Sequence, residues 1–235
     1  MSGFSGKSKS FLPPAEPETE LPGKITSIET QKRHPDRISL FVDGVFILGM
    51  PQSFKTKFSL TEGNTFSADD YSKIRKAAIQ HKSRDYLLNL LSRREHSRFE
   101  LYQKAARKGY ASADLDSVLD ELRERNYQSD ERFAASFARD KRDLKKWGPV
   151  KIKSHLISKG VSRKIIDQIL KMDDNLKSDI RQSIRDLVYK NRKRFKRELD
   201  ILRRRKKIYD FLIRKGYPSN EIASSLDELE TLIHT

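Results

Sequence analysis

The chain has 235 residues, and 49 Lys and Arg against 33 Asp and Glu give it a net charge of +16. Such an excess of positive charge predicts a polyanionic partner, and nucleic acid is the first candidate. There is no cysteine, which excludes disulfides, thiolate catalysis and cysteine-ligated zinc. No segment has the roughly 18 consecutive apolar residues of a membrane span, and the N-terminus lacks the apolar core of a signal peptide. A cytoplasmic protein without a membrane partner is expected.

The N-terminal quarter divides into a tail and a small sheet. Residues 1–22 are rich in Ser, Pro and charge, which predicts a disordered tail. Asp43-Gly44 separates two short runs of β-branched and aromatic residues, so strands at 38–42 and 45–48 should form a hairpin. A third strand at 24–31 would complete the sheet, because a lone hairpin is rarely stable in water.

One helix should close this N-terminal region, which we place at 23–83. Ser67 precedes "ADDYSKIRKAAIQHK" and can cap a helix over 68–82. The early Asp69 and Asp70 suit the positive end of the helix dipole.

The rest of the chain repeats. When Gly109, Gly160 and Gly216 are aligned, the segments that follow them superpose without a gap, and each glycine follows a lysine. Apolar residues recur eight and four positions before each glycine, and six and ten positions after it, which is a helical period. Glycine is the usual stop of a helix that ends in a basic turn, and Ser112, Ser162 and Ser219 are candidate caps of the next helices. Each unit thus contains a helix, a tight turn and a second helix.

A further helix precedes each pair, at 84–95, 129–146 and 177–195. The predicted fold is therefore mainly α, with three tandem three-helix repeats at 84–128, 129–173 and 174–235. Because each repeat is too small for a large core of its own, neighbours should stack into an elongated, curved rod.

The stretch "LLSRREHSRFELYQKAARKGY" is the first candidate site. Glu95 and His96 could form an acid/base or metal pair, but the second histidine of an HExxH motif is missing. The structural interpretation is a helix junction at which Ser97 caps the second helix, with Glu100 completing a capping box. Three arginines would then lie at an exposed corner, where a solvated role and a partner contact are equally open: Arg93, Arg94 and Arg98.

The stretch "KKWGPVKIKSHL" is the second candidate. Gly148 and Pro149 predict a sharp entry into a helix. Trp147 is the only tryptophan, and packing between helices is favoured for it over stacking on a base. Lysines flank this turn and form a candidate phosphate or acidic-surface contact: Lys145, Lys146, Lys151 and Lys153.

The densest charge lies between Lys190 and Lys207, where eleven basic residues accompany two acidic ones. A solvated helix could carry this charge for solubility alone, but like charges at helical spacing favour contact with an anion, either the phosphate backbone or an acidic protein surface. Lys190, Arg194 and Arg197 should share one helix side. The candidate contacts that share a side of the next helix are Arg203, Arg204 and Lys207, and Arg192 is a further candidate contact. Phosphate contacts of this kind position a protein without reading base sequence.

Taken together, "LLSRREHSRFEL", "KGY", "DERFAASFARDK" and "WGPVKIKSHLISKGV" resemble the RecX family of bacterial regulatory proteins in order and spacing. The resemblance covers about residues 84–233 and is weaker over the N-terminal hairpin. It implies a regulator that binds the RecA recombinase in its filament on single-stranded DNA and inhibits its ATPase, strand-exchange and co-protease activities. It also implies no catalytic residue. No metal or cofactor is expected either, since the histidines lack metal-ligand spacing. The third repeat departs from the family pattern, because it lacks a "WGP" counterpart.

A direct DNA-binding protein built from helix-turn-helix-like units is the alternative. Such proteins usually form dimers that contact two half-sites. Three unequal units in one chain suit a monomer on an extended partner instead. This difference favours the filament regulator, with DNA phosphates as an additional contact.

Overall fold

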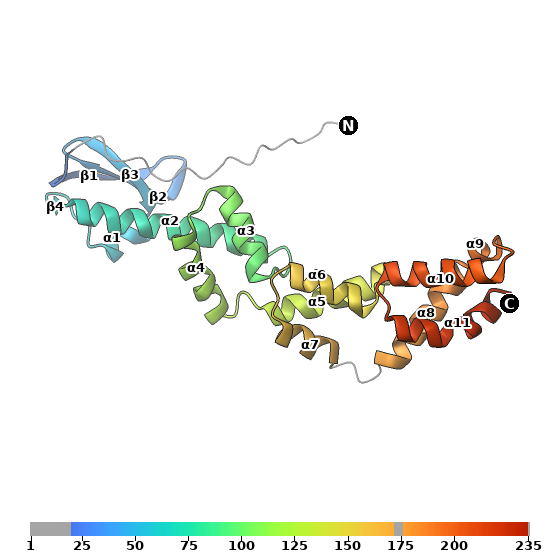
Figure 1. The fold of residues 1–235 in the computed structure, drawn as a ribbon. Helices are drawn as coiled ribbons and strands as arrows, with labels where there is room; N and C mark the ends of the chain where they lie inside the picture. Colours follow the sequence, from blue (N-terminus) through green and yellow to red (C-terminus); the bar gives the residue numbers. More distant parts are fainter. Residues whose placement is uncertain (1–19, 172–175, 235) are drawn as a thin grey trace, which may run out of the picture. The chain divides into compact units, whose positions relative to one another are not determined.

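A computed structural model describes residues 20–171 and 176–234 (Figure 1). The tail predicted at 1–22 falls almost wholly outside these residues. The described chain forms two compact units. The first contains the residues up to Arg93 together with Leu101–Tyr127, and the second contains Arg94–Glu100 and the residues from Gln128 onward.

The first unit begins with an antiparallel sheet in the order β3-β2-β1-β4. Its strands are β1 (Gly23–Gln31), β2 (His34–Val42), β3 (Val45–Pro51) and β4 (Thr65–Phe66). The predicted hairpin is confirmed, and Asp43 and Gly44 take φ angles of 48° and 78° at its turn, as a two-residue hairpin requires. The third predicted strand is confirmed as β1. Helix α1 (Ser53–Lys57) and the two-residue β4 are too short to carry a periodic signal, and the sequence did not predict them.

Helix α2 (Ala68–Leu91) follows the sheet. The predicted cap is confirmed, because Ser67 Oγ accepts from Asp70 N at 3.1 Å and the Asp70 carboxylate accepts from Ser67 N at 3.0 Å. The prediction of two separate helices, at 68–82 and 84–95, is wrong. Ser83 lies inside one continuous helix, fully buried, and its hydroxyl donates to Gln80 O at 2.9 Å.

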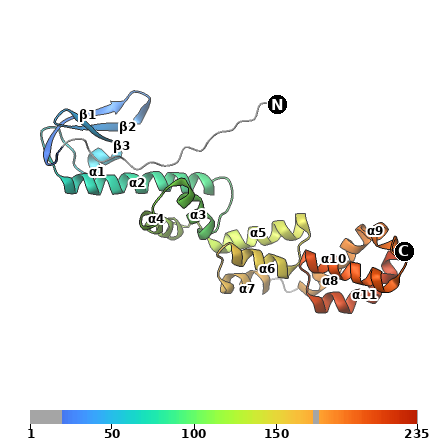
Figure 2. The ribbon, with the colours of Figure 1, turned by 45° about the horizontal axis from the view of Figure 1, so that its top comes forward.

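Helix α2 contributes to two hydrophobic cores. Its first half packs Tyr71, Ile74 and Ala78 against the sheet. Its second half packs Leu87 against α3 (Arg98–Lys108) and α4 (Ser112–Glu124). Figures 1 and 2 show the sheet beside one half of α2 and the helix pair beside the other. The boundary placed between residues 83 and 84 therefore falls within a helix that both parts share.

The second unit contains two further sets of helices. The first set comprises α5 (Asp130–Lys145), α6 (Pro149–Ser158) and α7 (Arg163–Lys171), and the second comprises α8 (Leu176–Lys190), α9 (Arg192–Lys196), α10 (Ile201–Lys215) and α11 (Ser219–His234). Phe133, Ile152 and Leu156 are central to one core, and Ile184, Ile208 and Leu212 to the other. The prediction of tandem three-helix repeats is confirmed.

The third repeat contains an extra helix. The sequence predicted one helix over 177–195, but α8 ends at Lys190 and α9 begins at Arg192. Phe195, only 1% exposed, anchors α9 in the core of the repeat. The short helix is therefore held in place while its basic side chains remain at the surface.

The turns between the second and third helices follow the predicted pattern. Gly109, Gly160 and Gly216 have positive φ angles of 102°, 77° and 89°. Of the three predicted caps, Ser162 accepts from Ile165 N at 3.4 Å. The cap of α4 is Ala111 rather than Ser112, and Ser219 is already the first residue of α11. Across 20–171 and 176–234, no helix combines the length and apolar character needed to cross a membrane.

Candidate functional site

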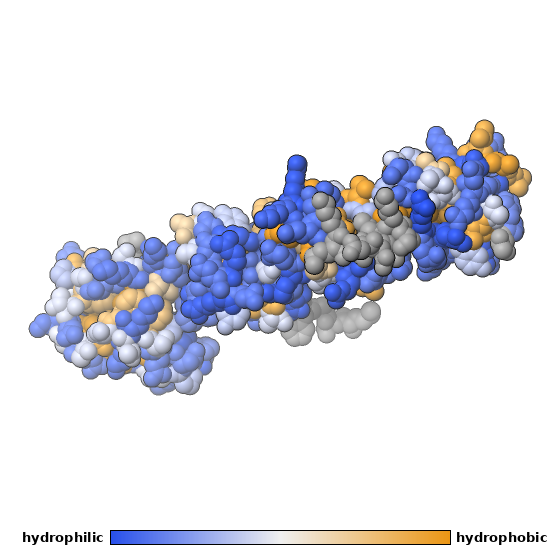
Figure 3. All heavy atoms as spheres, turned by 90° about the horizontal axis from the view of Figure 1, so that it is seen from below, coloured by the Kyte–Doolittle hydropathy of each residue, from blue (hydrophilic) through white to orange (hydrophobic). Residues whose placement is uncertain are grey.

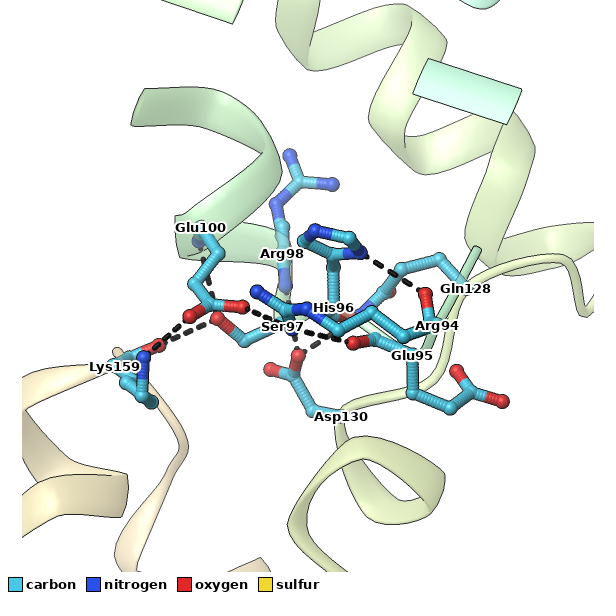
Figure 4. Close-up of polar contacts among 9 residues, drawn as sticks. All are labelled: Arg94, Glu95, His96, Ser97, Arg98, Glu100, Gln128, Asp130 and Lys159. Carbon is cyan, nitrogen blue, oxygen red and sulfur yellow. Dashed lines mark hydrogen bonds and ion pairs between the residues drawn. The ribbon is translucent and has the colours of Figure 1, made fainter. Parts of the chain in front are cut away.

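The segment Arg94–Glu100 belongs to the second unit, where its side chains form a polar junction (Figure 4). Glu95 Oε1 accepts from Arg132 Nε at 2.8 Å, whereas His96 Nδ1 lies 3.0 Å from Arg94 O. The two side chains therefore have different partners and form no acid/base pair. Within the described ranges there is also no group of three or more His, Cys, Asp or Glu that could hold a metal ion.

Ser97 has the capping role that the sequence predicts, and a second role besides. Its hydroxyl accepts from Glu100 N at 3.0 Å and donates to Lys159 O at 2.7 Å. The Glu100 carboxylate binds Lys159 Nζ, and Arg94 Nη1 at 3.0 Å. Burial would raise the pKa of Glu100, but the hydrogen bonds from Lys159 and Arg94 outweigh it and hold this pKa below its ordinary value. The segment is thus a helix junction that is also bonded to Lys159, in the turn between α6 and α7.

The three arginines at this junction differ in availability. Arg93 is exposed, and Arg94 is exposed but paired with Glu100. Arg98 is half-buried, and its backbone N–H donates to Asp130 Oδ1 at 2.9 Å. A partner could reach Arg93 directly, whereas Arg94 would have to exchange its carboxylate.

A cavity of about 420 Å³ lies beside this junction. Its lining includes Arg94, Glu100, Phe137, Trp147 and Lys159. Trp147 is half-buried, and its ring centroid lies 4.6 Å from that of His155 and 6.4 Å from that of Phe137. The favoured packing role of Trp147 agrees with these contacts. No sequence pattern predicts the cavity, because its walls come from segments that only the fold brings together.

The lysines around Trp147 divide into two pairs. Lys145 and Lys146 are exposed. Lys151 Nζ donates to Arg214 O at 3.1 Å and lies 4.8 Å from the Trp147 ring centroid, and Lys153 Nζ binds Asp167 at 2.7 Å. The second pair therefore stabilises the fold of this unit, which leaves Lys145 and Lys146 as the accessible cations.

Helix α9 carries the most accessible positive charge. We call the exposed residues around it the α9 basic surface: Lys190, Lys193, Arg194, Lys196 and Arg197. Among the described residues, none of these five side chains forms an ion pair with an N···O distance of 4.0 Å or less. Arg192, by contrast, lies 3.9 Å from the Tyr189 ring centroid and donates to Tyr189 O at 3.1 Å. The break at Asn191 means that Lys190 and Arg194 lie on different helices rather than on one helix face.

The expectation that Arg203, Arg204 and Lys207 share an exposed side needs correction. Arg204 is only 5% exposed, and it donates to Glu230 Oε1 at 2.6 Å and to Glu198 O at 2.7 Å. Lys207 binds Glu198, whose pKa this hydrogen bond lowers. Arg203 is exposed. The counter-charges come partly from α11, which the charge count of the basic run did not include.

Tandem three-helix repeats behind a small antiparallel sheet, with an exposed basic helix, define a helical-repeat protein suited to binding a polyanion or an acidic surface. Three family descriptions match the chain: "Regulatory protein RecX N-terminal domain" at 23–67, "RecX, first three-helix domain" at 84–122 and "RecX, second three-helix domain" at 129–170. The chain belongs to the RecX family of regulatory proteins. The match at 23–67 extends the resemblance over the hairpin, where the motifs were weaker.

Curated relatives and solved structures agree with this assignment. The regulatory protein RecX of Clostridium perfringens is 30% identical over 196 residues, which cover 83% of this chain and 91% of that protein. That of Listeria innocua is 28% identical over 203 residues, or 85% of this chain and 73% of the relative. A crystal structure of regulatory protein RecX superposes with a TM-score of 0.73 at 24% identity, over 88% of this chain and 99% of that one. The crystal structure of RecX from Lactobacillus salivarius superposes with a TM-score of 0.59 at 22% identity, over 66% of this chain and 99% of that one.

These relatives form a family of regulatory proteins and not a known family of enzymes. Family membership implies a role in the regulation of RecA.

Proposed function

We propose that this protein binds the RecA filament on single-stranded DNA and thereby restrains the ATPase, strand-exchange and co-protease activities of RecA. The family match over the N-terminal domain and two repeats is the observation that carries the proposal. Regulation then occurs through binding. The chain itself needs no cofactor or catalytic residue for it.

The α9 basic surface supports a contribution from DNA phosphates to this binding. Its side chains are exposed, and exposed Lys and Arg release counterions when they neutralise phosphates. Arg203 and the pair Lys145 and Lys146 are further accessible cations. Candidates with intramolecular partners, such as Lys151 and Lys153, would contact a partner only by exchanging those bonds. Arg204 is left out of the proposed contact because it is buried.

A matched pair of triple variants tests the phosphate contact. The first variant carries Lys193→Gln, Arg194→Gln and Arg197→Gln, and the control carries the same loss of charge at exposed Lys32, Arg33 and Lys55 of the sheet region. The α9 variant should bind both filament and bare single-stranded DNA more weakly. It should also flatten the slope of log affinity against log salt by about 2, or roughly 0.7 per lost contact. The control should keep the wild-type slope.

Comparison of the two substrates separates the filament regulator from a direct DNA-binding protein. The wild-type protein should prefer the filament at near-physiological salt, because contacts with RecA are screened less than contacts with exposed phosphates. It should also lower the DNA-dependent ATP hydrolysis of RecA and hydrolyse no ATP itself. Equal affinity for filament and bare DNA at every salt concentration would support the DNA-binding alternative and refute the proposal.

A further inference from the structure

The second unit contains one kind of contact twice. We call this contact a joint. In each joint, the first residues of the second helix of one repeat contact the Lys-Gly turn that precedes the third helix of the next repeat. We call these first residues a corner. In the first joint the corner is Ser97–Glu100 and the turn is Lys159-Gly160. Ser97 Oγ donates to Lys159 O at 2.7 Å, and a Cβ added to Gly160 would lie 2.5 Å from Phe99 Cβ.

The second joint repeats this arrangement with a different corner sequence. Gly148 N donates to Lys215 O at 2.8 Å, and Val150 N donates to Gly216 O at 3.1 Å. A Cβ added to Gly216 would lie 2.2 Å from Lys151 Cβ. Gly148 occupies the place of Ser97, immediately before the helix. Both corners thus donate to the carbonyl of the lysine and pack directly on the glycine.

A third corner lies at the start of α10 and is uncovered within the described residues. Asp200 caps α10 by accepting from Arg203 N at 3.0 Å, as Ser97 caps α3. Around it Leu199, Ile201 and Leu202 are 88%, 56% and 78% exposed. His96, which occupies the place of Leu199 at the first corner, is only 3% exposed. Figure 3 shows apolar side chains at the surface of this repeat, at the right of the view. Three neighbouring exposed aliphatic residues indicate an interaction site rather than scattered surface residues.

The first repeat carries the complementary half of such a joint. Its turn has the same Lys108-Gly109 sequence and a positive φ of 102° at Gly109, and the glycine is exposed. The turn leads into α4, whose sequence has five carboxylates and one arginine; of these carboxylates, Glu121 is paired with Arg84 and Arg125, and Asp120 with Arg123. The third corner follows directly on the α9 basic surface, so the two halves are also complementary in charge.

We propose that the third corner, Leu199–Leu202, docks the Lys108-Gly109 turn of a second copy of this chain, head to tail. The inference goes beyond the proposed regulation of RecA and does not depend on it. Within one chain, the covalent connection keeps the two halves of a joint at a high effective concentration. Two copies lack that connection, so the association is weak in dilute solution. It strengthens when copies are concentrated or held in a row.

Three variants of the full chain test the proposal. Leu199→Gln with Leu202→Gln removes the apolar corner without changing the charge of the α9 basic surface. Gly109→Asn blocks the turn, because its Cβ would meet the incoming corner as a Cβ on Gly160 or Gly216 would, and Asn tolerates the left-handed conformation better than most residues. Leu144→Gln changes a leucine that is 76% exposed and belongs to neither the third corner nor the turn, and it serves as the control. Circular dichroism melting checks that each variant folds.

Sedimentation velocity at about 10 to 500 µM measures self-association. These concentrations lie below the effective concentration of two halves of a joint that one chain connects. Wild type and the Leu144→Gln control should self-associate, and the corner and turn variants should each weaken association at least about tenfold. A mixture of corner and turn variants should form heterodimers, because each supplies the half that the other lacks. Wild type that stays monomeric throughout, or a mixture that does not associate, would overturn the proposal. So would a turn variant that associates as well as wild type, since the corner would then bind another surface. DNA binding by the corner variant should be unchanged, which separates this test from that of the proposed function.

Discussion

Gly216 should tolerate a methyl group far less well than Gly63, although both have a φ of 89°. Alanine at either position takes on the strain of the left-handed conformation, which is about 1 kcal/mol. Around Gly63 nothing lies within 4 Å of an added Cβ, whereas at Gly216 the added atom would lie 2.6 Å from Lys151 N and 2.2 Å from Lys151 Cβ. Forcing these segments apart adds an overpacking cost of about 1–3 kcal/mol. We therefore expect Gly216→Ala to lose about 2–4 kcal/mol of stability and Gly63→Ala about 1 kcal/mol.

Urea titration followed by the fluorescence of Trp147 measures the loss at Gly216, because this only tryptophan precedes the corner that Gly216 contacts. Hydrogen exchange of β1 measures the loss at Gly63, whose N–H donates to Ile25 O at 2.8 Å. Gly160→Ala and Gly44→Ala form a second pair, with φ angles of 77° and 78° and with Phe99 Cβ at 2.5 Å or no atom within 4 Å. If the crowded and open glycines of each pair lose equal stability, the close approach in the joints does not contribute and the argument fails.

Three further changes test which arginine stabilises the fold, how the stability depends on the ionisation of Tyr217, and whether the core around α3 and α4 needs the whole of α2. Arg204→Met should lower the free energy of unfolding by about 3 kcal/mol, because it leaves the Glu230 carboxylate without its buried partner, whereas Arg203→Met should change it by about 0.5 kcal/mol or less in the same urea titration. Burial raises the pKa of Tyr217 to about 12 from an ordinary 10.0, so the contribution of this group to stability, at most about 3 kcal/mol, is present below pH 10 and should fade as the pH rises towards 12. The free energy of unfolding of Tyr217→Phe should therefore fall less steeply with pH than that of wild type over that interval, and parallel curves would contradict the assignment. A chain that begins at residue 84 should lose protection of α3 and α4 from hydrogen exchange, because it cuts α2 and removes Ile79 from their core, and full protection would show that the second half of α2 is sufficient.

The features that local sequence determines were predicted well. Asp43-Gly44 specifies its hairpin through backbone conformations that few residue pairs adopt. The three glycines specify their turns, and the apolar period around them specifies the helices of each repeat. Ser67 specifies the start of α2 through a contact only three residues away.

The features that depend on distant residues were not predictable in the same way. Ser97 reaches Lys159, 62 positions along the chain, and Arg204 reaches Glu230, 26 positions away. A charge count over neighbouring residues cannot include such partners, so the sequence pattern predicts Arg204 at the surface although it is buried. Ser83 is a polar residue at a buried position, and its polarity obscured the continuity of α2. The cavity beside Trp147 has walls from several elements and hence no local pattern.

The continuity of α2 has a consequence for insertions and deletions in this part of the chain. A single rigid helix carries the residues that pack on the sheet, such as Ile74, and those that pack on α3 and α4, such as Leu87. Each residue of a helix advances it by about 1.5 Å and turns it by about 100°, since 3.6 residues complete a turn. One residue inserted near Ser83 would therefore rotate one packing face away from its partner, whereas an insertion of seven residues, close to two full turns, would nearly restore the angle. The number of residues in α2 thus sets the angle between the face that packs on the sheet and the face that packs on α3 and α4. Natural variation in its length should therefore favour changes near whole numbers of turns.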